Sequence, residues 1–256
     1  MILTIDSGNT HTTFGCVDES NAVTQIFRLP TDRSQTEYGY AASLRQVFDL
    51  CKIDVTALEG AIVSCVVPPL TETLVRAVRL LTGLEATVVG AGVKTGLHIC
   101  INDPGTVAAD LVAAAVAAKE EYPLPCVIVD MGTATTLTVV DERGRYIGGA
   151  ILPGAGLSLD ALAKGTALLP NVEIRPPRNV IAANTVDSMK SGILYGTAGA
   201  IDGLIDRFAE ELGREPASIV ATGGMSARIC PFCRHSVTVD ETLLLRGLAR
   251  IWRKNK

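Results

Sequence analysis

The chain carries one pattern twice, half a chain apart. Residues 2–19 read ILTIDSGNTHTTFGCVDE and residues 126–142 read CVIVDMGTATTLTVVDE. Each copy is an apolar, β-branched run that reaches Asp-x-Gly, followed by a Thr-rich turn, a second run and Asp-Glu. The leading aspartates, Asp6 and Asp130, are 124 positions apart (130 − 6), close to half of the 256 residues. The repeat therefore predicts two similar halves, each with a carboxylate at the tip of a β-hairpin, and two such tips are expected to form a nucleotide cleft.

Composition limits the partners that the chain can have. The hydrophobic content is 48%, the net charge is −4 and the pI is near 5.5, so we expect neither nucleic acid nor a membrane as partner. The basic segment 246–256 is expected to be a solvated helix end. Seven scattered cysteines indicate reduced thiols. No signal peptide and no apolar run of about 20 residues is evident, so a cytoplasmic protein is predicted.

Strand-like runs alternate with helical patterns along the chain, which predicts an α/β fold. Beyond the two hairpins, strands are expected at 60–67, 86–89 and 218–222. Helices are expected after a capping box at Ser34-x-x-Glu37, over 70–81, after Asp103-Pro104 and from Asp187.

The residue types at the two tips suit a polyphosphate. Backbone N–H groups can approach phosphate oxygens closely at Gly8, Asn9 and Thr10 supply donors, and Asp6 supplies a carboxylate for a metal shell. Asp130-Met131-Gly132-Thr133 offers the same set. Either motif alone is better explained as an ordinary tight hairpin. Both together, each after a buried strand, favour phosphate.

A glycine pair follows the strand expected at 218–222. Gly223 and Gly224 would let a flat ring or a ribose lie on bare backbone. A plain turn into a helix explains this fragment equally well. Its position after the second hairpin favours the nucleotide interpretation.

With these motifs in view, the chain resembles the type III pantothenate kinases, within the fold shared by actin, the sugar kinases and the heat-shock ATPases. This resemblance implies two duplicated ribonuclease-H-like (actin-like ATPase) halves, 1–118 and 119–256, flanking a nucleotide cleft. Seven motifs carry it in order, namely IDSGNTHTTFG (5–15), VSCVVPPLT (63–71), GVKTGL (92–97), VIVDMGTATT (127–136), GGAILPGAGLSLDAL (148–162), NTVDSMKSG (184–192) and ATGG (221–224).

The resemblance also implies an activity and site residues. It implies a homodimer that phosphorylates the small molecule pantothenate to its 4′-phosphate, the first step of coenzyme A biosynthesis, using ATP, Mg²⁺ and a monovalent cation (K⁺ or NH₄⁺). Asp110 matches the catalytic base, Thr185 a substrate contact, and Asp130 a cation ligand beside the metal ligand Asp6. ATP contacts are expected at Asp6, Ser7, Gly8, Asn9, Thr10, His11, Thr12, Thr13, Thr133, Gly223 and Gly224.

Asp110 also makes chemical sense as the base. Phosphoryl transfer depends on positioning and charge neutralisation, with a carboxylate to orient the acceptor hydroxyl and take its proton. The alternative is an ordinary surface residue of a helix. An unpaired aspartate between Ala108-Ala109 and Leu111-Val112 would be poorly placed there, so the functional interpretation is favoured.

The sequence departs from the family pattern around this aspartate. The family motif Gly-x-Asp-Arg reads Ala108-Ala109-Asp110-Leu111 here, and Ile101 stands where the family usually has tyrosine. Loss of an arginine that pairs with a carboxylate costs roughly 1.5–3 kcal/mol, a 10- to 100-fold effect or more. Because pantothenate is a carboxylate, its binding is the step affected, unless a basic residue such as Lys94 or Arg143 replaces the arginine.

Three functions stay open at this point. The leading one is a kinase of pantothenate or a related small hydroxyl compound, with the γ-phosphoryl group between Asp6 and Asp130. The second is a nucleotide-binding paralogue without catalysis, and the third is hydrolysis of ATP or polyphosphate, because this fold also hosts phosphatases.

Two further patterns are weaker. Cys230 and Cys233, with His235 nearby, have the spacing of half a zinc site, although loop thiols are the better interpretation. Glycines at 192, 196, 199 and 203 predict close packing of one helix against another, for which a dimer interface is one place.

Overall fold

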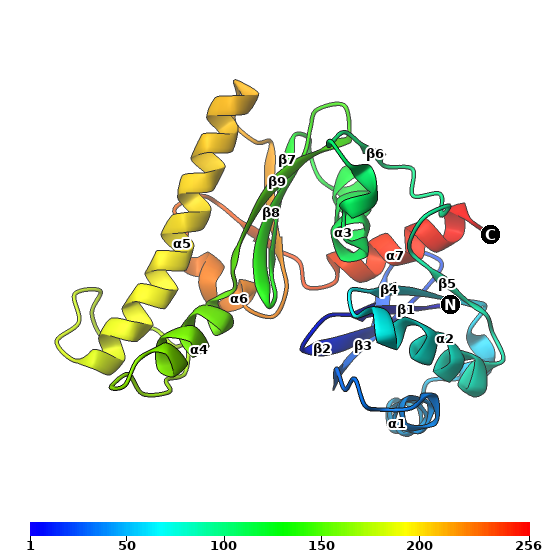
Figure 1. Cartoon of the computed structure of the whole chain (residues 1–256). Helices are drawn as coiled ribbons and strands as arrows, with labels where there is room; N and C mark the ends of the chain where they lie inside the picture. The colour runs from blue at the N-terminus through cyan, green and yellow to red at the C-terminus, as the bar shows by residue number, and fades with distance from the viewer. The chain divides into compact units, whose positions relative to one another are not determined.

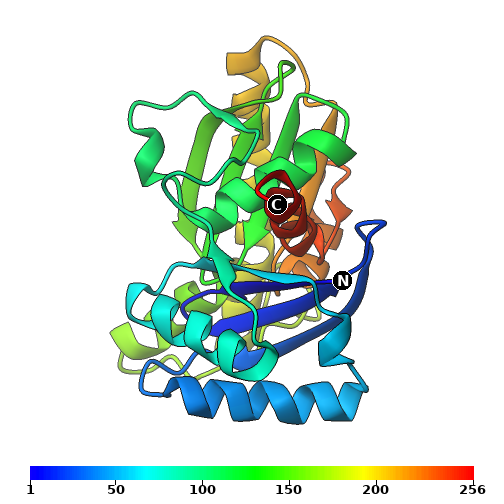
Figure 2. The same ribbon diagram turned by 90° about the vertical axis from the view of Figure 1, so that its right-hand side faces the viewer.

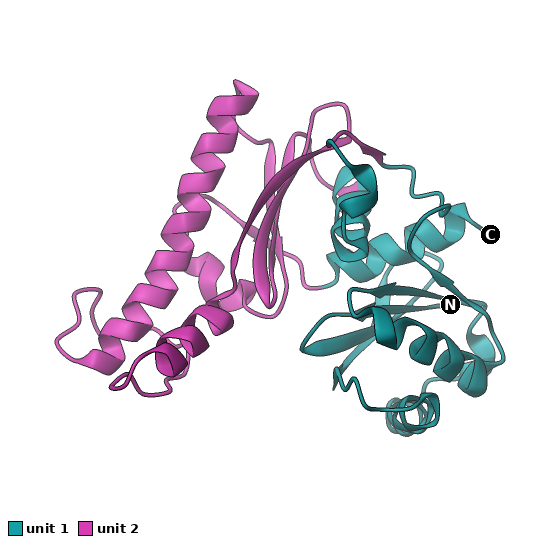
Figure 3. Cartoon of the chain, viewed as in Figure 1, with its two compact units in different colours: residues 1–97, 102–120, 242–256 teal, residues 98–101, 121–241 magenta.

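The computed structural model describes all 256 residues and groups them into two compact units (Figures 1 and 3). Unit 1 comprises residues 1–97, 102–120 and 242–256, and unit 2 comprises residues 98–101 and 121–241. The units collect residues by packing, so the last fifteen residues belong to the same unit as the first. The division into sequence halves at 118/119 describes the duplication and stays a prediction.

Unit 1 is built on a five-stranded sheet of order β3-β2-β1-β4-β5. β1 pairs antiparallel with β2 and parallel with β4, so the hairpin lies beside a parallel crossover. The strands are β1 (Ile2–Ser7), β2 (His11–Val17), β3 (Val23–Pro30), β4 (Gly60–Cys65) and β5 (Ala86–Val88). The helices are α1 (Glu37–Cys51), α2 (Pro68–Thr82), α3 (Ala109–Glu121) and α7 (Leu243–Lys254), with 3-10 turns η1 (Val55–Ala57) and η2 (Pro104–Thr106).

Helices cover both faces of this sheet. Apolar side chains of α1 and α2 pack on the face that carries Leu3 and Ile5. α7 packs on the opposite face, as Figure 2 shows with α7 in red seen nearly end-on. There, a Cβ atom on Gly60 would lie 2.0 Å from the Trp252 ring, and one on Gly15 would lie 2.8 Å from Leu245. α7 is therefore seated directly on the backbone of the sheet.

Unit 2 is built on a six-stranded sheet of order β11-β10-β7-β8-β9-β6. Its strands are β6 (His98–Ile99), β7 (Cys126–Met131), β8 (Ala134–Val140), β9 (Arg145–Pro153), β10 (Ser218–Thr222) and β11 (Thr238–Val239). α4 (Ala155–Gly165), α5 (Thr185–Leu212), α6 (Ser226–Ile229) and the turn η3 (Cys230–Phe232) contribute to one apolar core on this sheet.

The two sheets repeat one topology. Replacing β1, β2, β3, β4 and β5 by β7, β8, β9, β10 and β11 converts the first strand order into the second, to which β6 is added at the edge. Even the irregularity in pairing recurs, between Cys16 and Val17 in one sheet and between Val139 and Val140 in the other. The predicted α/β fold with duplicated ribonuclease-H-like halves is confirmed.

Local predictions at helix starts were less accurate. Thr36, not Ser34, caps α1, because its side chain accepts a hydrogen bond from the Gly39 N–H at 3.3 Å. Pro68 and Pro69 open α2 instead of only ending a strand, as proline does in a first helical turn. Asp103 caps the short turn η2, and α3 begins six residues later at Ala109.

Two packing predictions also need correction. A Cβ atom on any of the four α5 glycines would meet nothing within 4 Å, so no helix of this chain packs closely against them. The C-terminal segment is not a solvated helix end, because Leu248, Ile251 and Trp252 are buried.

None of the helices is long and apolar enough to span a membrane.

Candidate phosphate and acceptor site

The first hairpin tip is a short turn of accessible backbone. Three residues join β1 to β2, and the Gly8 N–H donates a hydrogen bond of 3.0 Å to the His11 carbonyl. Asn9, Thr10 and His11 are exposed. Their polar groups can therefore reach a ligand, as the sequence predicts.

Buried hydroxyl groups hold this turn from below. Ser7 and Thr12 are fully buried, and their hydroxyl oxygens lie 3.0 Å apart in a hydrogen bond. Thr31 donates to the Gly8 carbonyl at 2.8 Å, and Arg33 donates to the Asn9 side chain at 3.0 Å. Ser7 and Thr12 thus fix the turn in this structure. Sequence reasoning missed Thr31 and Arg33, because no local pattern links them to a turn about twenty residues earlier.

Asp6 lies at the carboxyl end of β1, between Thr13 of β2 and Ser64 of β4 in the strand register. Alternation along the strand places its side chain on the face of Thr4, the face that α7 covers. Ser64 points to the same face, is fully buried, and its Oγ has no hydrogen-bond partner. Buried polar atoms are normally paired, so a hydroxyl in this state next to a carboxylate indicates a place for water or a metal-bound ligand.

The second tip is held by close backbone contacts. Gly154, at the start of α4, donates its N–H to the Thr133 carbonyl at 3.1 Å. A Cβ atom there would lie 2.3 Å from that carbonyl oxygen and 2.5 Å from the Gly132 oxygen, so only glycine fits. Gly154 lies inside a quoted motif, but its role depends on a contact that sequence does not show.

Gly223 meets the aspartate of this tip. It has a φ of +87°, and a Cβ atom would lie 2.6 Å from Asp130 Oδ1 and 2.7 Å from the Met131 backbone. The glycine pair predicted to bind nucleotide is therefore brought together with Asp130 inside unit 2. Two neighbouring hydroxyl groups, of Thr135 and Thr136, are buried without hydrogen-bond partners.

Asp110 lies in the first turn of α3, in the same unit as Asp6. α3 touches α7 where Ala113 meets Gly247, and Glu120 forms an ion pair with Arg250. The two helices cross steeply, as Figures 1 and 2 show. Leu245 lies over Gly15 and Trp252 over Gly60, so α7 covers the sheet face to which Asp6 and Ser64 point. α7 therefore touches both the sheet that carries Asp6 and the helix that carries Asp110.

The Asp110 carboxyl is in a poorly solvated position. Burial raises its pKa above the ordinary range, against the opposing effect of the Leu111 N–H, which donates to Oδ1 at 2.8 Å. A raised pKa suits a carboxylate that must accept a proton.

The predicted acceptor residues are divided between the units. Ala108, Ala109 and Leu111 are half-buried on the same turn as Asp110 in unit 1. Ile101 and Thr185 belong to unit 2, where Thr185 is the exposed first residue of α5.

The donor set at the tips fits a magnesium nucleotide. No cluster of three or more His, Cys, Asp or Glu side chains is present that could hold a metal ion by itself. Mg²⁺ typically takes one or two carboxylates and completes its shell with water and substrate phosphates, so single aspartates beside unpaired buried hydroxyl groups suit it. Burial raises the pKa of Cys230 to about 11 and that of Cys233 to about 12, which disfavours thiolate ligands.

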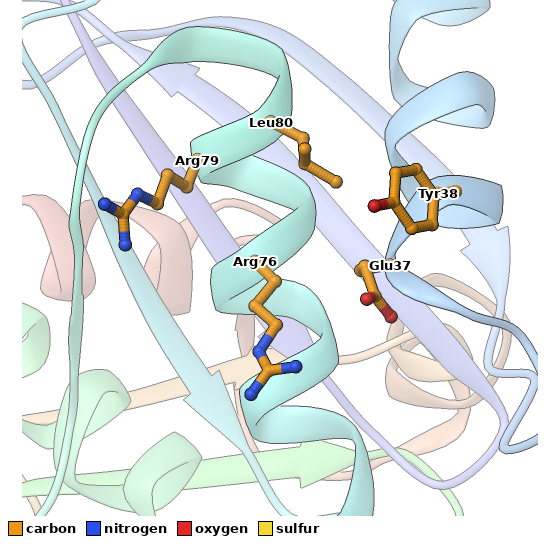
Figure 4. A pocket seen from close by; sticks show the side chains of 5 residues that line it. All are labelled: Glu37, Tyr38, Arg76, Arg79 and Leu80. Atoms are coloured by element: carbon orange, nitrogen blue, oxygen red, sulfur yellow. The ribbon is translucent and has the colours of Figure 1, made fainter.

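A pocket of about 440 Å³ lies elsewhere in unit 1, between α1 and α2 (Figure 4). Its two arginines are already paired, Arg76 with Glu72 at 2.9 Å and Arg79 with Glu85 at 3.1 Å. It lies on the sheet face opposite α7, so we do not assign it to the phosphate site.

The duplicated sheets with an Asp-Gly hairpin tip in each define the class of actin-like ATPases and sugar kinases. Two solved structures share this fold over nearly the whole chain. An activator of the 2-hydroxyisocaproyl-CoA dehydratase from Clostridium difficile, with bound ADPNP, has a TM-score of 0.56 at 13% identity and covers 98% of this chain and 92% of its own. A ROK family protein from Streptococcus pneumoniae, in complex with sucrose, has a TM-score of 0.53 at 13% identity, covering 99% and 98%.

Sequence comparison resolves the family within this class. A model of type III pantothenate kinase matches residues 2–207. A type III pantothenate kinase from Anaeromyxobacter sp. is 41% identical over 256 residues, covering 100% of both chains. The chain belongs to the type III pantothenate kinase family.

Replacing Gly223 by alanine is expected to weaken ATP binding by about 10-fold or more, because the new Cβ must displace the Asp130 carboxylate and strain a left-handed backbone. Titration calorimetry with Mg²⁺-ATP measures the loss. Gly203→Ala is the matched control, because its Cβ meets nothing within 4 Å. Equal affinity in both variants would show that Asp130 does not need this contact.

Replacing Asp110 by asparagine is expected to stabilise the fold at pH 7.5. A carboxyl whose pKa rises on folding contributes stability below its unfolded pKa, and this contribution is lost as pH rises through the folded pKa. The melting temperature of Asp110→Asn should therefore exceed that of the wild type at pH 7.5, and the difference should vanish near pH 4. The exposed Asp49→Asn variant serves as control. A lower melting temperature at pH 7.5 would contradict the buried-carboxylate picture.

Proposed function

We propose that this chain transfers the γ-phosphoryl group of ATP to the 4′-hydroxyl of pantothenate, with Asp110 as the base. The observation that carries the proposal is Asp110 itself, a poorly solvated carboxyl whose pKa is raised by burial, on a helix that packs against α7 in the same unit as Asp6. Family membership and full-length identity to a named type III pantothenate kinase support it.

Asp110 acts on the acceptor. Its carboxylate accepts the hydroxyl proton as the hydroxyl oxygen forms a bond to the γ-phosphorus, and the bond from that phosphorus to the bridging oxygen breaks, releasing ADP. A general base contributes about 10²- to 10⁴-fold to such a step. The half-buried surroundings of Asp110 also limit water, the competing acceptor.

The two tips bind the phosphates. Exposed backbone N–H groups and side chains at Asn9, Thr10 and His11 offer donors on one tip, and Thr133 with Gly223 and Gly224 on the other. Asp6 and Asp130 would hold Mg²⁺ and a monovalent cation (K⁺ or NH₄⁺), which neutralise the phosphate charge when bound. Ser7 and Thr12 keep the first turn in shape.

The acceptor pocket departs most from the family resemblance. Leu111 takes the place of an arginine, and Ala108 and Ile101 take the places of glycine and tyrosine. We propose that these changes make the protein hold pantothenate more weakly than an arginine at position 111 would, or make it accept a related and less acidic hydroxyl compound. Ala109 and Thr185 are proposed as further acceptor contacts. A homodimer and a cytoplasmic location belong to the same proposal, as does the absence of nucleic-acid and membrane partners.

The proposal is tested by product analysis with Asp110→Asn. The wild-type protein should form ADP and phosphopantothenate in equal amounts, and the variant should lose at least 10²-fold in kcat while still binding Mg²⁺-ATP. Mass spectrometry of the acceptor and calorimetry with ATP give the two readouts. Unchanged turnover in the variant would remove Asp110 as the base, and ADP formed without a phosphorylated acceptor would indicate a hydrolase.

Replacing Leu111 by arginine is expected to lower the KM for pantothenate by 10- to 100-fold, because a guanidinium group can pair with the pantothenate carboxylate. The control is within the same assay. The KM for a pantothenamide, in which an amide replaces that carboxylate, should change little. If the KM falls for both acceptors, or for neither, Leu111 is not near the acceptor carboxylate.

A further inference from the structure

A close backbone contact between two helices of unit 1 lies one turn along α3 from the proposed base. At Gly247 of α7, a Cβ atom would lie 1.9 Å from the Ala113 carbonyl oxygen and 2.7 Å from its carbon. These are backbone atoms of α3, which no rotation of a side chain can move aside. Any residue other than glycine at 247 would therefore push the two helices apart by about 1 Å.

α7 has little freedom to yield. It is seated on the sheet of unit 1 through Trp252, which fills the space above Gly60, and through Leu245, which fills the space above Gly15. Eight of its twelve residues are buried. The two helices are of nearly equal length, but α7 packs on three strands of the sheet, whereas α3 packs less extensively on any other element. The displacement therefore falls mainly on α3.

α3 carries Asp110 one turn before the contact. Residues three apart lie on neighbouring turns of one helix, so a shift at Ala113 passes directly to Asp110. At the other end of α3, Glu120 pairs with Arg250 and, at 3.2 Å, with Lys254. The contact with Gly247 therefore lies between Asp110 and the ion pairs, and α3 can pivot about it.

We propose that Gly247 is a positioning residue for Asp110, setting the depth at which α3 holds the carboxylate against the acceptor. This inference rests on the proposed function, in which Asp110 is the base. A misplacement of about 1 Å in a catalytic group can cost on the order of 10²-fold in rate. Gly247 itself touches no substrate and takes no part in the chemistry.

The test compares Gly247→Ala with Gly60→Ala. Both variants add one methyl group at a contact of α7. Gly247→Ala collides with the backbone of α3, whereas Gly60→Ala collides with the Trp252 side chain of α7 and not with α3. Both variants should lose melting temperature. Only Gly247→Ala should lose 10-fold or more in kcat with the Kd for Mg²⁺-ATP unchanged. The acid limb of its kcat/KM profile should also move to lower pH. The reason is that lifting α3 hydrates Asp110 and so lowers a pKa that burial had raised.

Two results decide the matter. If Gly247→Ala and Gly60→Ala show the same kcat and the same acid limb, Gly247 has only a structural role and the inference is wrong. If Asp110→Asn itself keeps full activity, the proposed function fails first, which is a separate outcome.

A second variant keeps the test decisive if Gly247→Ala does not fold. Glu120→Gln removes the ionic hold on the far end of α3 without a steric clash. It should lower kcat several-fold and move the acid limb to higher pH, because release of the far end swings Asp110, on the opposite arm of the pivot, towards α7 and buries it further. An unchanged kcat and acid limb in this variant would overturn the inference.

Discussion

Close approach of a neighbouring group to the backbone, possible only where one residue is glycine, occurs at three places beside the proposed functional residues. Gly223 lies against the Asp130 carboxylate, Gly154 against the carbonyl groups of the second tip, and Gly247 against the helix that carries Asp110. At each place a Cβ atom would lie 1.9–2.6 Å from a neighbouring oxygen. Because backbone atoms cannot rotate away, these contacts fix distances more strictly than side-chain packing does. The proposed positions of both carboxylates depend on them.

The duplicated halves use their tips differently in spite of a common topology. The first tip is supported by hydroxyl groups and by Arg33, and its outer residues stay exposed. The second is pressed between Gly154 and Gly223, which leaves less freedom around Asp130. Two copies of one hairpin have thus become an exposed set of hydrogen-bond donors and a closely packed carboxylate. Asp110 has no counterpart in the repeat, and in the proposed function it accepts the proton.

Much of the fold could be predicted from sequence because its signals are local. A few residues suffice to predict the turns between strands and the apolar runs of β1, β4, β7 and β10. The duplication follows from direct comparison of two segments. The family motifs pointed to the right family, which the full-length comparison confirms.

The errors arose where a residue's role depends on a distant partner. Thr36 caps α1 in place of Ser34 because the chain turns two residues later than the motif suggests. The α5 glycines were expected to touch another helix, yet it is Gly247 that does, and no pattern around it distinguishes the two cases. The basic C-terminal segment was expected to be solvated, but its apolar residues recur at helical spacing between the charges and form a buried face of α7. The proposed roles of the tip residues and of Asp110 rest on such long-range contacts, so they remain for experiment.

The central claim is that an intact phosphate site serves a weakened acceptor pocket. It is tested most directly by measuring ADP release from Mg²⁺-ATP, with K⁺ or NH₄⁺ present, at zero and at millimolar pantothenate. Stimulation that saturates only at high pantothenate concentration is the predicted result. ADP release that pantothenate does not change, in a protein that ATP stabilises against heat, would contradict it and would assign the phosphate site to another acceptor.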